Sequence, residues 1–298
     1  MKHISVLLDE SIKYLNIKEN GIYVDATLGG AGHSKAILNH LSSGHLYSFD
    51  QDSYAIEYAS KVLESFSNYT LIKSNFQHLT SELNRLNVFK IDGILFDLGL
   101  SSFQIDDRER GFSYLDDFDL DMRMNQQSDF SAIDVLNNYS IEQLTRVFRD
   151  YGEEKNAYQI AKKIVANRPI NTTKELVQIC DQVNFKVKGH SAKRVFQALR
   201  IEVNQELDVL KKTLDQLINL LNPGGRIVII TFHSLEDRIV KHYFKDNSEV
   251  KIIKGLPIAV EPKAPLKLIN HKPILPSEEE MNVNSRSRSA KLRVAEKV

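Results

Sequence analysis

Residues 25–34 place a carboxylate, Asp25, directly before a glycine-rich turn, a pattern that is typical of a cofactor site. The apolar run at 21–24 predicts a buried strand before this turn, and residues 35–38 predict the start of a helix after it. Glycines between a strand and a helix let the backbone turn tightly and let a ligand lie against bare main chain. A tight turn without any ligand is the alternative interpretation.

The spacing of the glycines argues against a phosphate-binding loop. Gly30 and Gly32 match the first two glycines of the dinucleotide fingerprint G-x-G-x-x-G, but Lys35 occupies the third position. The P-loop pattern G-x-x-x-x-G-K-[ST] is absent. Asp25 would repel a pyrophosphate and would suit a ligand that carries positive charge. S-adenosylmethionine, with its sulfonium, ammonium and adenosine, fits this description.

A second acid, Asp50, ends the strand predicted at 45–50 and follows Gly32 by 18 residues. An acid at this place in a βαβ unit can accept hydrogen bonds from both ribose hydroxyls. It therefore supports an adenosine without choosing between cofactors, because NAD sites use the same device. The alternative is that Asp50 caps the helix predicted to begin at Asp52, which has an apolar face at helical spacing.

Two more strands are predicted at 69–73 and 91–96, and they alternate with helical segments. This alternation predicts a parallel sheet covered on both faces, with ligands bound beyond the carboxyl ends of the strands. The residues expected at that edge are Asp25, Asp50, Phe76 and Asp97. Four such residues at one edge are difficult to explain by packing alone.

Composition is that of a soluble globular protein: of 298 residues, 42% are hydrophobic and 26% are charged. No apolar run approaches the roughly 20 residues that span a bilayer, so no membrane partner is expected. The single cysteine, Cys180, excludes an internal disulfide and a cysteine-based zinc cluster, and it favours a cytoplasmic location. No metal site is recognisable. The formal net charge of zero argues against general nucleic-acid binding but allows local basic stretches, which occur at 186–200 and 286–293.

The α/β pattern is interrupted by a mostly helical segment. Capping boxes at 140–143 and 172–175 predict helix starts, and Gly152 is expected to end the first of these helices. We therefore expect one α/β domain, formed by residues 1–106 and 204–298, with a helical domain inserted at 107–203.

The α/β pattern resumes beyond the insertion. A long helix is predicted from Val203 to Leu221, and Asn222-Pro223-Gly224-Gly225 should end it. A fifth strand is expected at 226–232, a helix at 236–244 and a final strand at 289–296.

Taken together, the motifs resemble the MraW family of ribosomal RNA methyltransferases over nearly the whole chain. The motifs that carry this resemblance are Leu7–Glu10, Asp25–Ser34, Asp92–Gly99, Gln104–Asp107, Arg110–Ser113, Leu120–Met124, Tyr151–Glu154, Phe196–Ile201, Phe232–Arg238 and Ser285–Ser289. The resemblance implies a Rossmann-like class I methyltransferase fold and S-adenosylmethionine as cofactor. It also implies methyl transfer to the exocyclic amine, N4, of a cytidine in 16S rRNA of the small ribosomal subunit.

The cofactor residues of the family map onto matching positions in this chain. They imply Ala31, Gly32 and His33 in the loop, Asp50 at the ribose and Phe76 near the adenine, and they add Asp97 and Gln104 around the rest of the ligand. Gln104 rests on the resemblance only. Many members of the family have glycine where this chain has Ala31.

Asp97 is the candidate catalytic residue, because an acceptor that takes a hydrogen bond from a cytosine amine makes its nitrogen a better nucleophile. The carbonyls of Leu98 and Gly99 are alternatives, and Asp97 can equally hold the methionine part of the cofactor. Many amino-methyltransferases have a Pro-Pro-aromatic segment after this acid, whereas this chain has Leu98-Gly99-Leu100. A stacking aromatic must then come from elsewhere, and Phe103 and Phe112 are candidates.

His233 and Ser234 follow the fifth strand and are expected near the base, with a buried structural histidine as the alternative. The target cytidine must be unstacked, with the helical insertion and the basic stretches holding the surrounding RNA by its phosphates. Competing hypotheses are a methyltransferase acting on another nucleobase or on protein, a non-catalytic RNA-binding ribosome assembly factor, and an NAD-dependent oxidoreductase. The last is disfavoured by Asp25 and the broken fingerprint. Both a monomer and a homodimer are compatible with the sequence.

Overall fold

The computed structural model describes all residues except 1–3, 102, 105–106, 187 and 251–262. The chain forms two compact units, residues 1–99 with 209–298 and residues 100–208. The sequence places the corresponding boundaries at 106/107 and 203/204, and residue 106 lies outside the described part. Among the described residues, no helix is both long enough and apolar enough to cross a lipid bilayer.

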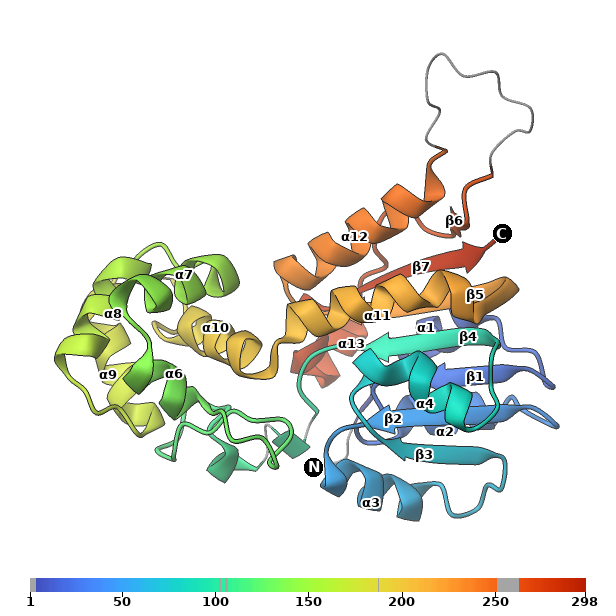
Figure 1. Cartoon of the computed structure of the whole chain (residues 1–298), viewed down its shortest axis with the longest axis horizontal. Coiled ribbons are helices and arrows are strands. Elements are labelled where there is room, and N and C mark those ends of the chain that lie inside the picture. The colour runs from blue at the N-terminus through green and yellow to red at the C-terminus, as the bar shows by residue number, and fades with distance from the viewer. Residues whose placement is uncertain (1–3, 102, 105–106, 187, 251–262) are drawn as a thin grey trace. The chain divides into compact units, whose positions relative to one another are not determined.

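The first unit is built on a seven-stranded sheet with the order β3-β2-β1-β4-β5-β7-β6 (Figure 1). The strands are β1 (Ile22–Asp25), β2 (His45–Asp50), β3 (Tyr69–Lys73), β4 (Ile91–Asp97), β5 (Leu221–Thr231), β6 (Leu266–Leu268) and β7 (Lys291–Lys297). Strands β1 to β5 pair in parallel, whereas β7 is antiparallel to both β5 and β6. The predicted Rossmann-like fold is therefore confirmed.

Helices cover both faces of this sheet. They are α1 (Leu8–Leu15), α2 (Gly32–Leu38), α3 (Ser53–Val62), α4 (Leu79–Arg85), α11 (Glu206–Leu220), α12 (Ser234–Ser248) and α13 (Glu278–Val283), with 3-10 turns η1 (Phe76–His78) and η3 (Ser285–Ser289). Successive side chains of a strand point to opposite faces, so Phe96 packs in the cluster that contains residues of α4, α11 and α12. Its neighbour Leu95 packs with residues of α1, α2 and α3. Burial on both faces explains the continuous apolar runs in the sequence.

The sequence misplaces the helix that leads into β5. Instead of one helix from Val203 to Leu221, the chain breaks at Gln205, which has a left-handed φ of 50°. Val203 therefore belongs to the preceding helix, α10 (Lys193–Asn204). The last residue of α10, Asn204, accepts a hydrogen bond from the Met124 amide and donates one to the Met122 carbonyl. These long-range contacts fix the end of α10, and no local pattern predicts them.

Strand β5 also begins earlier than predicted, at Leu221. Leu221 pairs with Ile91 and Arg226 with Gly93, so the turn at 222–225 interrupts the register within the strand. The strands β2 and β3 have the predicted bounds, and β7 begins two residues later than expected. Helix α1 was not predicted.

The second unit contains helices around a core of its own. They are η2 (Arg108–Arg110), α6 (Ala132–Asn138), α7 (Ile141–Gly152), α8 (Ala157–Ala166), α9 (Thr173–Asn184) and α10. The predicted capping boxes at Ser140 and Thr172 are both formed. Gly152 does not end α7 by taking a left-handed conformation, because Glu153 does so. A Cβ at Gly152 would lie 2.5 Å from the Arg194 carbonyl oxygen, so glycine allows α7 to approach α10 closely.

Candidate methyl-transfer site

The carboxyl ends of three neighbouring strands bring three acids to one edge of the sheet. Asp25 ends β1, Asp50 ends β2 and Asp97 ends β4, and β1 lies between the other two strands. This placement follows from parallel pairing, because the carboxyl ends of parallel strands lie at the same edge. Asp97 Oδ2 is 3.6 Å from Nδ1 of His33 in the glycine-rich loop.

The glycine-rich loop closes onto the end of β2. The Leu28 amide donates to the Phe49 carbonyl, and the Gly29 amide donates to Oδ2 of Asp50. Ala31 has a left-handed φ of 61° and is fully buried, which explains why glycine suits this position. Helix α2 begins at Gly32, three residues earlier than the sequence predicts.

Asp25 lies beneath the loop rather than at its surface. Its side chain is fully buried, and it accepts hydrogen bonds from the Thr27 amide and from the Ser34 hydroxyl, the latter at 2.7 Å. Burial raises its pKa to about 6, against the lowering effect of these hydrogen bonds. Asp25 thus shapes the loop and contributes negative charge from below.

Asp50 joins the loop to the segment after β2. Besides the Gly29 amide, it accepts a hydrogen bond from the Asp52 amide at Oδ1. Burial raises its pKa to about 6. The cap of α3 is Asp52, whose side chain accepts from the Tyr54 amide, so Asp50 is not the N-cap of that helix.

Asp97 is the least compensated of the three acids. Its amide donates to the Thr27 hydroxyl, whereas Oδ1 of its carboxylate is buried and has no hydrogen-bond partner among the residues that the structure describes. Burial is the main cause that raises its pKa to about 8, and the nearby negative charges of Asp25, Glu236 and Glu280 contribute to the same rise. Thr27, Glu236 and Glu280 were missed by sequence reasoning. Only Glu236 had a local signal, because it stands three residues after His233 at a helix start.

His33 is held from both sides of its ring. Nε2 lies 3.1 Å from the Val6 carbonyl oxygen, while Nδ1 faces Asp97. The loop is packed tightly here, because a Cβ at Gly32 would lie only 2.0 Å from the Ser5 hydroxyl. The segment 4–7 therefore forms one wall of the glycine-rich loop.

Phe76 follows β3 and begins the 3-10 turn η1. Its ring meets that of Phe96 edge-on, with centroids 5.7 Å apart, so it is supported by the core beneath the sheet edge. The preceding Asn75 donates to the Gln51 side chain and so ties the segments after β2 and β3 together. The half-buried Phe76 ring retains surface for a ligand.

Gln104 belongs to the second unit, where it exchanges hydrogen bonds with Ser101 through the backbone and side chain of both residues. Residues 105–106 of the same motif lie outside the described residues. Phe112 is buried in the core of the second unit, with the Arg110 guanidinium 5.7 Å from its ring centroid. The prediction of Phe112 as a stacking aromatic is therefore wrong, because its ring is taken up by internal packing.

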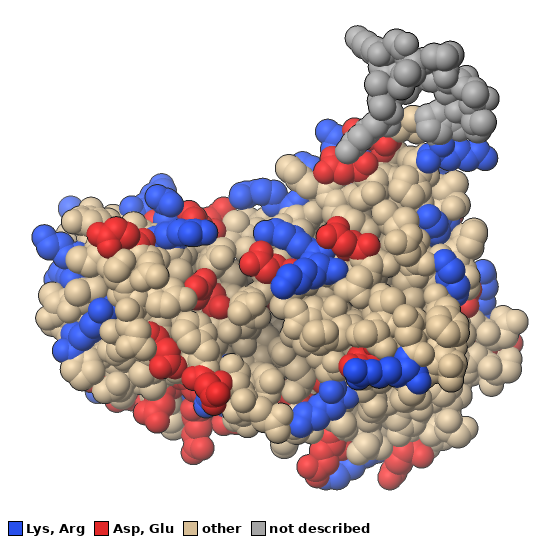
Figure 2. Space-filling view, viewed as in Figure 1, with Lys and Arg blue, Asp and Glu red and all other residues tan. Residues whose placement is uncertain are grey.

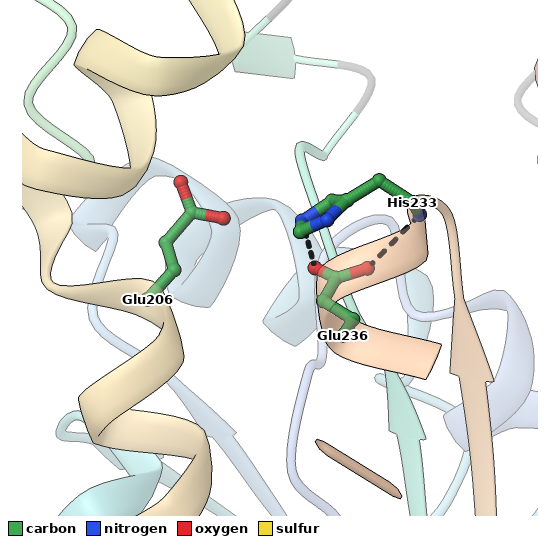
Figure 3. Close-up of side chains that lie close together, drawn as sticks. All are labelled: Glu206, His233 and Glu236. Carbon is green, nitrogen blue, oxygen red and sulfur yellow. Dashed lines mark hydrogen bonds and ion pairs between the residues drawn. The ribbon is translucent and has the colours of Figure 1, made fainter. Parts of the chain in front are cut away.

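His233 and Glu236 form a buried pair at the start of α12 (Figure 3). The ring Nε2 of His233 lies 3.1 Å from Glu236 Oε1, although the two atoms are not aligned for a hydrogen bond. Oε2 of Glu236 accepts from the Phe232 and His233 amides. Glu206, also drawn in Figure 3, pairs with Arg200 at 2.8 Å within the second unit. The His233–Glu236 pair favours the structural interpretation of this histidine, with Glu236 capping the helix.

The electrostatics of this edge fit a cationic ligand. Within the described part of the chain, neither a lysine nor an arginine pairs with Asp25, Asp50 or Asp97. Each of these carboxylates has a raised pKa because burial opposes its negative charge. A ligand that carries a positive charge but no phosphate would offset this cost, and S-adenosylmethionine meets both conditions. The buried, unpartnered Oδ1 of Asp97 is the specific atom that such a site leaves for a hydrogen-bond donor.

Comparison with known proteins agrees with this geometry. Ribosomal RNA small subunit methyltransferase H 1 of Acholeplasma laidlawii is 60% identical over 297 residues, covering 100% of this chain and 99% of the relative. Ribosomal RNA small subunit methyltransferase H of Onion yellows phytoplasma is 56% identical, covering 99% and 97%. The Clostridium botulinum protein of that name is 52% identical, covering 100% and 99%. A family model matches residues 1–298, and the chain belongs to the MraW methylase family.

Proposed function

We propose that this protein transfers a methyl group from S-adenosylmethionine to the N4 amine of a cytidine in 16S rRNA of the small ribosomal subunit. Support comes from membership of the MraW methylase family and from relatives named as ribosomal RNA methyltransferases. The observation that carries the proposal is Asp97, a carboxylate at the end of β4 with one buried oxygen that no described residue hydrogen-bonds.

The cofactor side of the site is assigned to the carboxyl edge of the sheet. Asp50 would hold the ribose hydroxyls, Phe76 would contact the adenine, and the loop at 31–33 would lie against the rest of the ligand. Asp97 and Gln104 complete the proposed set. When bound, S-adenosylmethionine supplies a methyl group made electrophilic by its sulfonium. The buried acids of the chain would bind this positively charged ligand more tightly than the neutral thioether that remains after transfer, which favours exchange of product for fresh cofactor.

On the substrate side, Asp97 acts on the amine. A cytosine amine is a weak nucleophile because its lone pair is delocalised into the ring. Oδ1 of Asp97 would accept a hydrogen bond from the amine and orient its nitrogen for attack. The Asp97 carboxylate would accept one N–H proton as the methyl group passes from sulfur to nitrogen, a transfer that breaks the carbon–sulfur bond and leaves a neutral thioether. The raised pKa of Asp97 suits a proton acceptor that works near neutral pH.

The second unit is proposed to bind the RNA around the target. The predicted basic stretch at 186–200 remains partly available, because Lys186, Lys193 and Arg194 are exposed. Phe185 is 74% exposed beneath the Lys186 ammonium, so it offers a ring for base stacking next to a cation for phosphate. Arg200 is paired with a carboxylate and is not assigned this role.

In the C-terminal basic stretch, by contrast, two of the basic residues have a structural role. Lys291 and Arg293 both pair with Asp237, which joins β7 to α12. On the face shown in Figure 2, lysines and arginines alternate with acidic residues. RNA contact is therefore assigned to local groups in the second unit.

The decisive experiment incubates the protein with small ribosomal subunits that lack the modification and with S-adenosylmethionine carrying a labelled methyl group. Nucleoside mass spectrometry of the RNA then locates the label. We expect N4-methylcytidine from the wild type and at least a hundredfold slower labelling from Asp97→Asn. Glu57→Gln, an exposed carboxylate on α3, is the matched control and should behave as the wild type.

Label in another nucleoside would overturn the assignment of cytidine. Cofactor binding without any transfer to the subunit would favour a non-catalytic assembly factor. Both results are distinct from a failure to bind S-adenosylmethionine, which would overturn the site itself.

A further inference from the structure

Two segments near the ends of the described chain, 4–7 and 280–284, meet beside the glycine-rich loop, although they are more than 270 residues apart in sequence. Oε1 of Glu280, on α13, accepts a hydrogen bond from the Leu7 amide at 2.8 Å. The Asn284 side chain donates to the Ile4 carbonyl at 3.1 Å. These contacts lie next to two sequence motifs, the N-terminal one at 7–10 and the C-terminal one at 285–289. The site described above gives neither motif a role.

The Leu7 amide stands at a strained turn. Leu7 is fully buried and has a left-handed φ of 50°, a conformation that non-glycine residues seldom adopt. Its neighbour Val6 directs its carbonyl oxygen to Nε2 of His33. The hydrogen bond that the Leu7 amide donates to Glu280 therefore fixes the peptide group whose carbonyl holds the histidine.

A carbonyl oxygen only accepts hydrogen bonds, so Nε2 of His33 carries the proton. Nδ1, the other ring nitrogen, faces Oδ2 of Asp97 at 3.6 Å, and a proton on either of these two atoms couples the ring to the carboxylate. The Val6 carbonyl thereby sets both the orientation and the tautomer of the ring beside the carboxylate. Groups with like charge surround Asp97 from β1, α12 and α13, through Asp25, Glu236 and Glu280.

We propose that Glu280 is a positioning residue for methyl transfer, acting through the Leu7 amide, the Val6 carbonyl and His33 on Asp97. The inference rests on the proposed function for its kinetic consequence, but the arrangement it describes is independent of the substrate. Glu280 touches neither the reacting atoms nor the cofactor in this scheme. Its contribution is to keep His33 in one tautomer and one orientation, which keeps the acceptor oxygen of Asp97 aimed at the amine.

Three substitutions separate positioning from general stability. Glu280→Gln keeps an oxygen acceptor for the Leu7 amide and should retain kcat within about threefold of the wild type. Glu280→Ala removes the acceptor, and Glu280→Asp withdraws it by one methylene. Each of these two should lower kcat roughly 10- to 100-fold, the scale expected for a small misplacement of catalytic groups. KM for the ribosomal subunit should remain near its wild-type value, and Glu278→Ala on the same helix, exposed at its surface, is the control.

A second measurement does not depend on activity. Nitrogen-15 NMR of labelled histidine should show His33 in the wild type and in Glu280→Gln with Nε2 protonated. In Glu280→Ala and Glu280→Asp the same ring should show a mixture of tautomers.

The proposal would be overturned if Glu280→Asp left both the His33 signals and kcat unchanged. It would also be overturned if Glu280→Gln and Glu280→Ala lowered kcat equally. If the wild type methylates no RNA while the tautomer responds as expected, the proposed function fails and the positioning contact stands. If Glu280→Ala does not fold, Glu280→Asp and Glu280→Gln still decide the question.

Discussion

Replacing Asp97 by asparagine should make the ligand-free protein more stable at neutral pH, even though we expect the same change to slow methyl transfer at least a hundredfold. The folded state raises the pKa of this carboxyl from 3.8 to about 8, chiefly through burial. Between these two values the folded protein holds the Asp97 proton more tightly than the unfolded chain does. Stability contributed by this proton is therefore fully present below pH 3.8 and is lost as the pH rises towards 8.

The magnitude follows from the shift. One pKa unit corresponds to about 1.4 kcal/mol, so the ionisable carboxyl destabilises the fold by about 2 kcal/mol at pH 5 and by up to about 4 kcal/mol at pH 7. Asparagine does not ionise, so it makes no pH-dependent contribution to the free energy of unfolding. The free energy of unfolding of Asp97→Asn minus that of the wild type should rise by about 1.4 kcal/mol per pH unit and level off above pH 8.

Urea denaturation at pH 5, 6, 7 and 8 without cofactor measures this difference. Placing an amide at the site changes the free energy of unfolding by the same amount at all four pH values. The slope of the free-energy difference with pH is therefore the diagnostic quantity. Glu57→Gln, with 71% side-chain exposure, should give a nearly flat difference. A difference for Asp97→Asn that does not change with pH would refute the reasoning, because it would mean that Asp97 is already solvated or compensated in the folded state.

Three further substitutions test other parts of the structure. Asp50→Ala should weaken S-adenosylmethionine binding at least a hundredfold by calorimetry, since about 1.5–3 kcal/mol is expected for each hydrogen bond to a charged group; unchanged affinity would remove Asp50 from the site. Gly152→Ala should destabilise the protein by roughly 1–3 kcal/mol in urea, because its new Cβ would overlap the Arg194 carbonyl; a neutral effect would mean that α7 and α10 separate easily. Asp237→Asn should cost about 3 kcal/mol at pH 7, because it leaves Arg293 and Lys291 without their buried partner. Burial raises the pKa of Asp237, but hydrogen bonding and charge from Arg293 and Lys291 lower it overall. This cost should therefore begin to fall as the pH drops below about 4 and should vanish only below the lowered pKa of the folded state, the opposite direction from Asp97.

Local patterns in the sequence determined most of the strands and several helix starts. The strands at 45–50 and 69–73 have their predicted bounds, although β3 is an edge strand and most of its residues are only partly buried. The capping boxes at Ser140 and Thr172 form as predicted because each needs only four consecutive residues. The alternation of strands and helices was also sufficient to predict that Asp50 and Asp97 lie at the same edge of a parallel sheet. Their roles toward a cofactor remain predictions.

Tertiary structure decided what depends on distant partners. The break at Gln205 is set by Asn204 contacting a loop about 80 residues earlier, and the burial of Phe112 is set by the core of the second unit. Periodicity carries no information about such pairs. The same reason hides the contact of Glu280 with Leu7, which spans 273 residues, and the raised pKa of Asp97. A sequence states which groups can ionise, but only the folded chain determines how much water and which charges surround them.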